Sequence, residues 1–286
     1  MSATANLAYV SMFERRVRHL AQQGMARLRP WVMEVADGGE AHNFDRMGSG
    51  EVSAKTTRKT PTPDDETAWS RRKSIPAAYH RGDVYEKADI NQMLADPGSN
   101  YVMNHGMAAK RGIDDEIIAA ATGASRTGAG ASVAFLAGQT VGDGTAAINF
   151  DLVTQVGELF STNDIDPDEP KVFVISPKQQ RKLLQLTEAT SRDYSLMDAL
   201  RKGYVDSWMG FSWVVSTRLL APSANQVDCF AMTRKAIGLQ MNQDATTEVA
   251  KDPSISFAWR VYTYLEVGAI RVEDEQLVRV HLSEVI

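Results

Sequence analysis

Apolar residues recur at helical spacing between residues 97 and 122. Asp96-Pro97 supplies an N-cap and a first-turn proline, and Gly123 supplies a C-cap. The apolar stripe consists of Met103, Met107, Ile113, Ile117 and Ala121. A helix from Pro97 to Thr122 would be about 39 Å long at 1.5 Å per residue. Such a length favours a structural strut.

Further along the chain, helical and strand patterns alternate and then give way to strands. Ile148, Leu152 and Val156 predict a second amphipathic helix. The run Lys171–Ile175 is typical of a buried strand, and Ser176-Pro177 begins the next helix. Another helix is expected at Ser195–Lys202, and strands at Phe211–Thr217, Cys229–Met232, Ile237–Met241, Phe257–Val272 and Gln276–Val285. The pattern predicts a mixed α+β fold.

The N-terminal region predicts a helix over Phe13–Arg29 with one basic face. That face includes Arg15, Arg16 and Arg18. A basic face is most often solvated, and the functional alternative is docking on an acidic partner or on nucleic acid. Farther on, Asp37-Gly38-Gly39 is a hairpin turn signal, so we expect paired strands near Trp31–Val35 and Ala41–Met47.

The segment Ala41–Asp83 is poor in apolar residues. Only 11 of its 43 residues are hydrophobic, against 43% of the whole chain, and 14 are charged. An acidic block, Asp64-Asp65-Glu66, precedes a basic block, Arg71-Arg72-Lys73. Such a segment cannot bury enough apolar surface to fold by itself. We therefore expect it to become ordered on another surface, with the isolated Trp69 as an anchor.

Composition narrows the function classes. Lys and Arg total 31 against 36 Asp and Glu, so the net charge of −5 disfavours a nucleic-acid binder that depends on a global basic field. The single cysteine excludes internal disulfides and multi-cysteine metal sites, and favours a reducing compartment. We find no apolar run of membrane-spanning length and no secretory signal pattern. A soluble, cytoplasmic chain is expected.

Candidate catalytic motifs are weak. The five histidines lack the spacing of a helical metal site, and the glycine-rich stretch 123–130 lacks the Lys-Ser/Thr pair of a phosphate loop. Ser176 lacks the flanking glycines of a nucleophile elbow and is best explained as a helix cap. Cys229 lies in an apolar run, which is typical of a buried, inert thiol. We therefore expect no catalytic, cofactor-binding or metal-binding residues and no cofactor, and a function carried by surfaces that meet other copies.

Five blocks of sequence between residues 12 and 285 carry a longer pattern. They are Gln22-Gln23-Gly24 with Leu28-Arg29; Ser70-Arg71-Arg72-Lys73 leading into Asp83–Gly98; Asp114-Asp115-Glu116-Ile117-Ile118 to Gly123; Val172–Pro177; and Ala236–Leu239 through Gly268–Val272. In their order and spacing these blocks resemble the major capsid proteins of tailed bacteriophages, which have the Hong Kong 97-like capsid fold.

The resemblance implies an architecture and a function. The architecture comprises an N-terminal arm (1–28), an extended loop (29–82), a peripheral domain with a long spine helix (83–145), an axial domain (146–242) and a return to the peripheral domain (243–286). The implied function is non-enzymatic self-assembly into hexamers and pentamers of an icosahedral head that encloses double-stranded DNA. Implied partners are scaffolding, portal and decoration proteins and packaged DNA bound without sequence specificity, with no membrane. The implied location is the virion, which would be assembled in the host bacterial cytoplasm.

The residues expected to contact neighbouring subunits are Arg15, Arg16, Arg18, Trp69, Arg71, Arg72 and Lys73. We expect the basic block Arg71-Arg72-Lys73 to bridge to acidic residues of a neighbour, in a heterologous contact that closes into rings. Each exposed ion pair contributes only about 0–1 kcal/mol, so a shell depends on many contacts at once. Replacing all three residues with Glu should then block assembly and leave the monomer folded.

Two alternatives remain open from the residues alone. An encapsulin-type nanocompartment shell protein shares the fold, but it would carry a cargo-binding pocket in place of a long N-terminal arm. An α/β enzyme built on Lys171–Leu186 would need a concave polar pocket with perturbed titrating groups.

Overall fold

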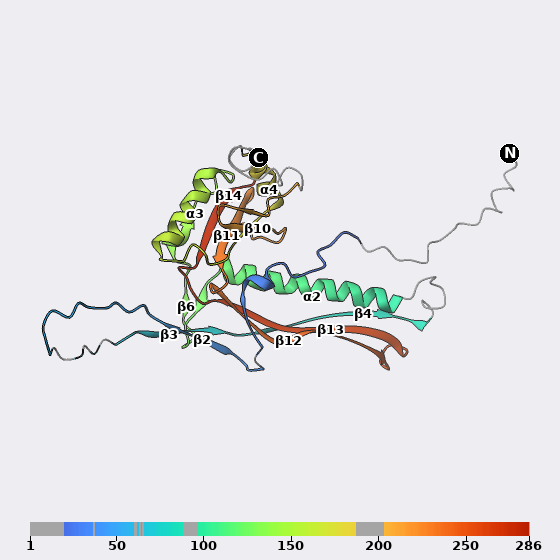
Figure 1. Ribbon diagram of the computed structural model, residues 1–286. Coiled ribbons are helices and arrows are strands. Elements are labelled where there is room, and N and C mark those ends of the chain that lie inside the picture. Colours follow the sequence, from blue (N-terminus) through green and yellow to red (C-terminus); the bar gives the residue numbers. More distant parts are fainter. Residues whose placement is uncertain are drawn as a thin grey trace, which may run out of the picture. The chain divides into compact units, whose positions relative to one another are not determined.

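The computed structural model describes residues 20–36, 38–59, 62, 64, 66–87, 97–186 and 203–285 (Figure 1). The chain divides into two compact units. Unit 1 comprises Met1–Ala26, Ala78–Gly112 and Gln243–Leu265, and unit 2 comprises Arg27–Ala77, Ile113–Asn242 and Glu266–Ile286. Over the described residues, the helices are too short or too polar to span a bilayer.

A six-stranded sheet in unit 2 forms one side of a hydrophobic core. Its strand order is β7 (Thr140–Val141), β14 (Leu277–Ser283), β11 (Gln226–Thr233), β8 (Lys171–Ile175), β10 (Phe211–Val215) and β9 (Ser207–Trp208). β8 and β10 run parallel, and β11 is antiparallel to β8. β8 has neighbours on both edges and is buried along its whole length, as the apolar run Val172–Ile175 predicts.

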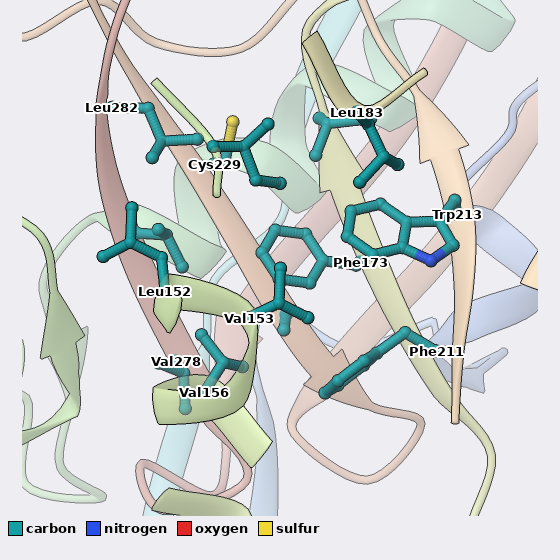
Figure 2. Packing of buried hydrophobic residues seen from close by; sticks show 14 of the residues in the cluster. Leu152, Val153, Val156, Phe173, Leu183, Phe211, Trp213, Cys229, Val278 and Leu282 are labelled. Atoms are coloured by element: carbon teal, nitrogen blue, oxygen red, sulfur yellow. The ribbon is translucent and has the colours of Figure 1, made fainter. Parts of the chain in front are cut away.

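Two helices pack against this sheet, α3 (Phe150–Thr162) and α4 (Pro177–Leu183). Figure 2 shows Val153 of α3 beside Phe173 of β8, with Leu152 and Val156 of the same helix in the same cluster. Phe173 in turn stacks on Trp213 of β10, with ring centroids 4.6 Å apart. The core therefore forms where the apolar stripe of α3 and Leu183 of α4 face the sheet.

Both helices begin at side-chain caps. Asn149 Oδ1 accepts a hydrogen bond from Leu152 N at 2.8 Å, and Ser176 Oγ accepts one from Gln179 N at 3.3 Å. These caps satisfy backbone donors that have no partner within the first turn. Ser176 is thus a helix cap, as its sequence context predicts.

A four-stranded sheet has the order β1 (Met33–Val35), β12 (Ile237–Asp252), β13 (Ala258–Arg271) and β4 (Ala77–Tyr85). The long helix α2 spans Pro97–Thr122, and this confirms the predicted bounds. Two short antiparallel pairs complete the strands: β2 (His42–Met47) with β3 (Trp69–Ser74), and β5 (Ser125–Arg126) with β6 (Ser132–Val133). Arg29–Trp31 and Ala137–Gln139 form 3₁₀ turns.

The expected hairpin between β1 and β2 is wrong. β1 pairs in parallel with β12, and β2 pairs with β3. The intervening turn is tied to β12 instead, because Gln240 Nε2 and Asn242 Nδ2 donate to the Gly39 carbonyl at 3.1 and 2.9 Å. These side chains are about 200 positions away in sequence, so the local turn signal did not reveal the pairing.

The predicted N-terminal helix does not extend through residues 20–28, which are irregular. In unit 1, Arg111 Nη1 of α2 donates to Gln22 Oε1 at 2.8 Å, and Gln22 Nε2 donates to Asn104 Oδ1 at 3.2 Å. In unit 2, the Asp114 carboxylate accepts from the backbone N–H groups of Arg27 and Leu28. Side chains of α2 thus bind this segment in its irregular course. The expected helix over Ser195–Lys202, and residues 13–19, lie outside the described residues.

Candidate inter-subunit surface

The antiparallel pair of β2 and β3, here called the ribbon, brings the predicted contact residues together. Its register sets His42 opposite Ser74 and Met47 opposite Trp69. Because side chains alternate along a strand, neighbouring residues point to opposite faces. The inner face carries Phe44, Arg46 and Arg72, and the outer face carries Asp45, Met47, Trp69, Arg71 and Lys73.

The inner face packs on its own subunit. Phe44 is buried in a small cluster with Ile270 and Val272, flanked by Met33 and Val35. The packing on β12 is close: a Cβ at Gly238 would lie 2.6 Å from Phe44 Cε1. A glycine at this position therefore lets the aromatic ring lie directly on the strand backbone.

Charged groups of the inner face are paired within the chain. Arg46 donates to both carboxylate oxygens of Glu273, at 3.1 and 3.0 Å. Arg72 is buried and forms a short ion pair with Asp274. Asp274 also accepts from Arg271 Nε at 2.6 Å. The turn between β13 and β14 thereby anchors the ribbon by ion pairs on both of its strands.

Arg271 lies at the centre of this anchor and has 0% exposure. Its remaining donors reach the carbonyl oxygens of Gly123 and Ala134, at 2.6 and 3.3 Å. Its guanidinium also lies 4.7 Å from the centroid of the Phe135 ring. A buried arginine is stable only where its charge and donors are matched, so the anchor depends on all of these partners.

The outer face is open to solvent and mixes apolar and charged groups. Trp69 is 71% exposed, and Met47, directly across from it, is 63% exposed. Beside them Arg71 Nε donates to Asp45 Oδ1 at 2.6 Å, and both of these side chains are exposed. Lys73 is half-buried on the same face. Trp, Met and Arg are the residues most enriched in protein–protein interfaces.

The structure therefore sorts the predicted contact residues into different places. Trp69, Arg71 and Lys73 share the outer face, whereas Arg72 points inward and its charge is used by Asp274. For Arg72 this changes the expectation: a Glu there would bury a carboxylate against Asp274, so the triple replacement would not leave the monomer intact. Arg15, Arg16 and Arg18 lie outside the described residues. The register adds Met47 and Asp45 to the outer face, and the sequence analysis did not single out either residue.

The enzyme alternative finds little support in unit 2. A cavity of about 460 Å³ lies at the ends of β8 and β10, lined by residues that include Ser176, Lys178 and Glu284. These three are engaged with one another: Ser176 Oγ donates to Glu284, and Lys178 Nζ lies 3.0 Å from Glu284 Oε2. Cys229 is fully buried, and burial raises the pKa of its thiol above the ordinary value. Ser176 therefore acts as a helix cap and Cys229 as a buried thiol, and neither of these two side chains is an activated nucleophile.

Comparison with known proteins agrees with this architecture. The model of the phage capsid protein family matches residues 5–284. A capsid protein of cyanophage P-SCSP1u superposes with a TM-score of 0.78 at 15% identity, over 97% of this chain and 94% of that one. For Mycobacterium phage Che8 the values are 0.73, 14%, 96% and 97%, and for the capsid of an empty GTA particle 0.70, 15%, 99% and 98%. No curated protein matches significantly.

At these identities the structural likeness shows the shared fold, which is the expected Hong Kong 97-like capsid fold. The family match covers nearly the whole chain. The matching family model describes phage capsid proteins, so the encapsulin alternative is not favoured. This chain therefore belongs to the phage capsid protein family.

Proposed function

We propose that many copies of this chain form the shell of a tailed-phage head, as hexamers and pentamers around packaged double-stranded DNA. The family match over residues 5–284 is the observation that carries the proposal. The net charge of −5 is compatible with it, because a strongly basic inner wall would bind DNA and hinder its packing. Assembly would take place in the host cytoplasm, with scaffolding, portal and decoration proteins as partners.

Within this proposal each part of the chain has an architectural role. Residues 1–28 act as the N-terminal arm and 29–82 as the extended loop. Residues 83–145 and the first part of 243–286 form the peripheral domain, and 146–242 form the axial domain around the five- and six-fold axes. The closing strand β14 belongs with the axial segment, because it pairs with β11. The role is structural, and no catalytic step is assigned to any residue.

The outer face of the ribbon is the proposed contact of the extended loop with a neighbouring subunit. Trp69 and Met47 supply an apolar anchor, and an aromatic anchor of this kind typically accounts for much of the binding energy. The Asp45–Arg71 pair and Lys73 lie beside it and supply orientation through charge. The inner face, held by Arg72 and Asp274, fixes the direction in which this surface is presented.

Electron microscopy of the purified chain tests the proposal. We expect uniform polyhedral particles, whereas small discrete oligomers would contradict a shell function. The double variant Arg71→Glu/Lys73→Glu should lower particle yield and leave the monomer folded, because both side chains lie on the outer face. The charge-preserving variant Arg71→Lys/Lys73→Arg is the matched control. Normal particles from the Glu variant would remove this face from the proposed contact.

A further inference from the structure

The turn between β12 and β13 in unit 1 has an unusual backbone. Ala258 N donates to the Ile255 carbonyl at 2.7 Å, which closes a four-residue turn. Its two central residues are left-handed: Ser256 has a φ of 47° and Phe257 a φ of 54°. A turn with two left-handed central residues strongly prefers Asn-Gly or Gly-Gly, because other side chains are strained in this region. A bulky aromatic residue at the second position is a marked exception.

Phe257 gains little within its own subunit. Its side chain is 67% exposed at the tip of the hairpin. The base of the turn is nevertheless well held, because Ser254 N donates to Asp252 Oδ1 at 2.9 Å and Arg260 Nη2 lies 2.9 Å from Asp252 Oδ2. The ring is therefore displayed on an ordered support, which lowers the entropy cost of binding. Backbone strain that is not offset by packing within the same subunit points to a function.

Unit 1 also contains a cavity that fits an aromatic ring. Its volume is about 170 Å³, and α2, β4 and β13 line it through Ala108, Ala109, Gly112, Tyr79 and Leu265, together with His80, Arg81, His105 and Thr263. Cavities of about 150 Å³ with apolar walls bind benzene. The small residues of α2 leave the space open. His105 is already satisfied, by Asp83 Oδ2 at 2.7 Å and Thr263 Oγ1 at 3.1 Å.

Phe257 cannot fill the cavity of its own subunit. Along β13, Phe257 precedes the lining residue Thr263 by six positions, which is about 20 Å in an extended strand. That separation is far beyond the reach of one side chain. An aromatic plug and a matching socket that cannot meet within one copy are the elements of a heterologous contact between copies.

We propose that Phe257 of one subunit inserts into the cavity between α2, β4 and β13 of a neighbouring subunit. The contact rests on the proposed function, because it needs a second copy held nearby in a shell. It is separate from the outer face of the ribbon and would join subunits through unit 1. Unlike the ion pairs of the ribbon, it depends on shape and on the burial of an apolar ring.

Replacement of the ring tests the plug. Phe257→Gly relieves the left-handed strain and should leave the thermal unfolding temperature of the monomer unchanged or higher, while particle yield falls roughly tenfold. Val249→Ala, at another exposed apolar position on β12, is the control and should assemble normally. Ala109→Leu should reduce assembly from the other side by filling the socket. Full particle yield from Phe257→Gly would overturn the proposal.

Cysteine cross-linking tests the pairing while Phe257 is retained. Cys229 is the sole cysteine and is buried, so background reaction is low. We expect Ser256→Cys/His80→Cys particles to form covalent ladders with a short bis-maleimide, and each single variant to form none. Ladders from Ser256→Cys alone would mean that tips meet tips, and particles without ladders would separate tip from socket; either result overturns this inference and leaves the shell function standing. Absence of particles from the unmodified chain would instead refute the proposed function, and this inference with it.

Discussion

Replacing Asp274 with Asn would remove the carboxylate that two buried arginines share. Arg72 and Arg271 both donate to Asp274, and both are more than nine-tenths buried. Arg271 would keep its bonds to the Gly123 and Ala134 carbonyl oxygens, but neither supplies a negative charge. The perturbation therefore leaves two guanidinium charges in the interior, with a neutral amide in place of their counter-ion.

The cost follows from burial. Breaking a buried ion pair by removing one partner typically costs about 3–5 kcal/mol, because the remaining charge is left uncompensated. Glu273→Gln is the matched control, since the Arg46–Glu273 pair is partly exposed, at 22% and 28%, and an ion pair with access to solvent costs less to break than a buried one. The free-energy cost of Asp274→Asn should therefore be several-fold larger than that of Glu273→Gln.

Amide hydrogen exchange on the unassembled chain measures this difference locally. Asp274→Asn should speed exchange in β2 and β3 by up to roughly two to three orders of magnitude, because each 1.4 kcal/mol is a factor of ten. The amides of β8 and α3, in the core of the six-stranded sheet, serve as an internal reference. Equal, small effects of Asp274→Asn and Glu273→Gln would refute the reasoning that the buried anchor holds the ribbon.

Three further predictions concern Gly238, Ser176 and Cys229. Gly238→Ala forces a Cβ to within 2.6 Å of Phe44 Cε1, so urea denaturation should show a loss of about 1–3 kcal/mol that Phe44→Leu partly restores. Ser176→Ala removes the α4 cap and the bond to Glu284, and should cost about 1–2 kcal/mol in the same assay. Burial raises the pKa of Cys229 above its ordinary value of 9.0, so a thiol reagent should label it only as fast as the chain unfolds. Rapid labelling of the native chain would contradict the burial. Above about pH 9 the thiol loses its proton in the unfolded chain but keeps it in the folded chain, so the free energy of unfolding should fall as the pH rises.

Local signals predicted the regular elements well where the signal was itself local. The bounds of α2 and β8 agree with the sequence analysis, because caps and apolar periodicity lie within the elements they define. The pairing of β1 with β12 was missed because the turn after β1 is bound by Gln240 and Asn242, which lie far along the chain and give no local signal. The irregular course of residues 20–28 depends likewise on Asp114 and Arg111 of α2.

The candidate surface was predictable in composition but not in orientation. The sequence placed Trp69, Arg71, Arg72 and Lys73 in one contact group. The two-residue period of a strand already implies that Arg72 faces away from Arg71 and Lys73. Which side turns inward is decided by Glu273 and Asp274, some 200 positions later, and no local pattern carries that information.

The alternation of the ribbon also constrains how this protein can vary in evolution. Inserting or deleting one residue within β2 or β3 would exchange inside for outside along the rest of that strand. Arg71 would then be driven into the interior while Arg72 lost its counter-ion. The connection between residues 48 and 68 obeys no such parity, since lengthening a surface loop costs little. Among related capsid chains, length differences should therefore gather in that connection and spare the two strands.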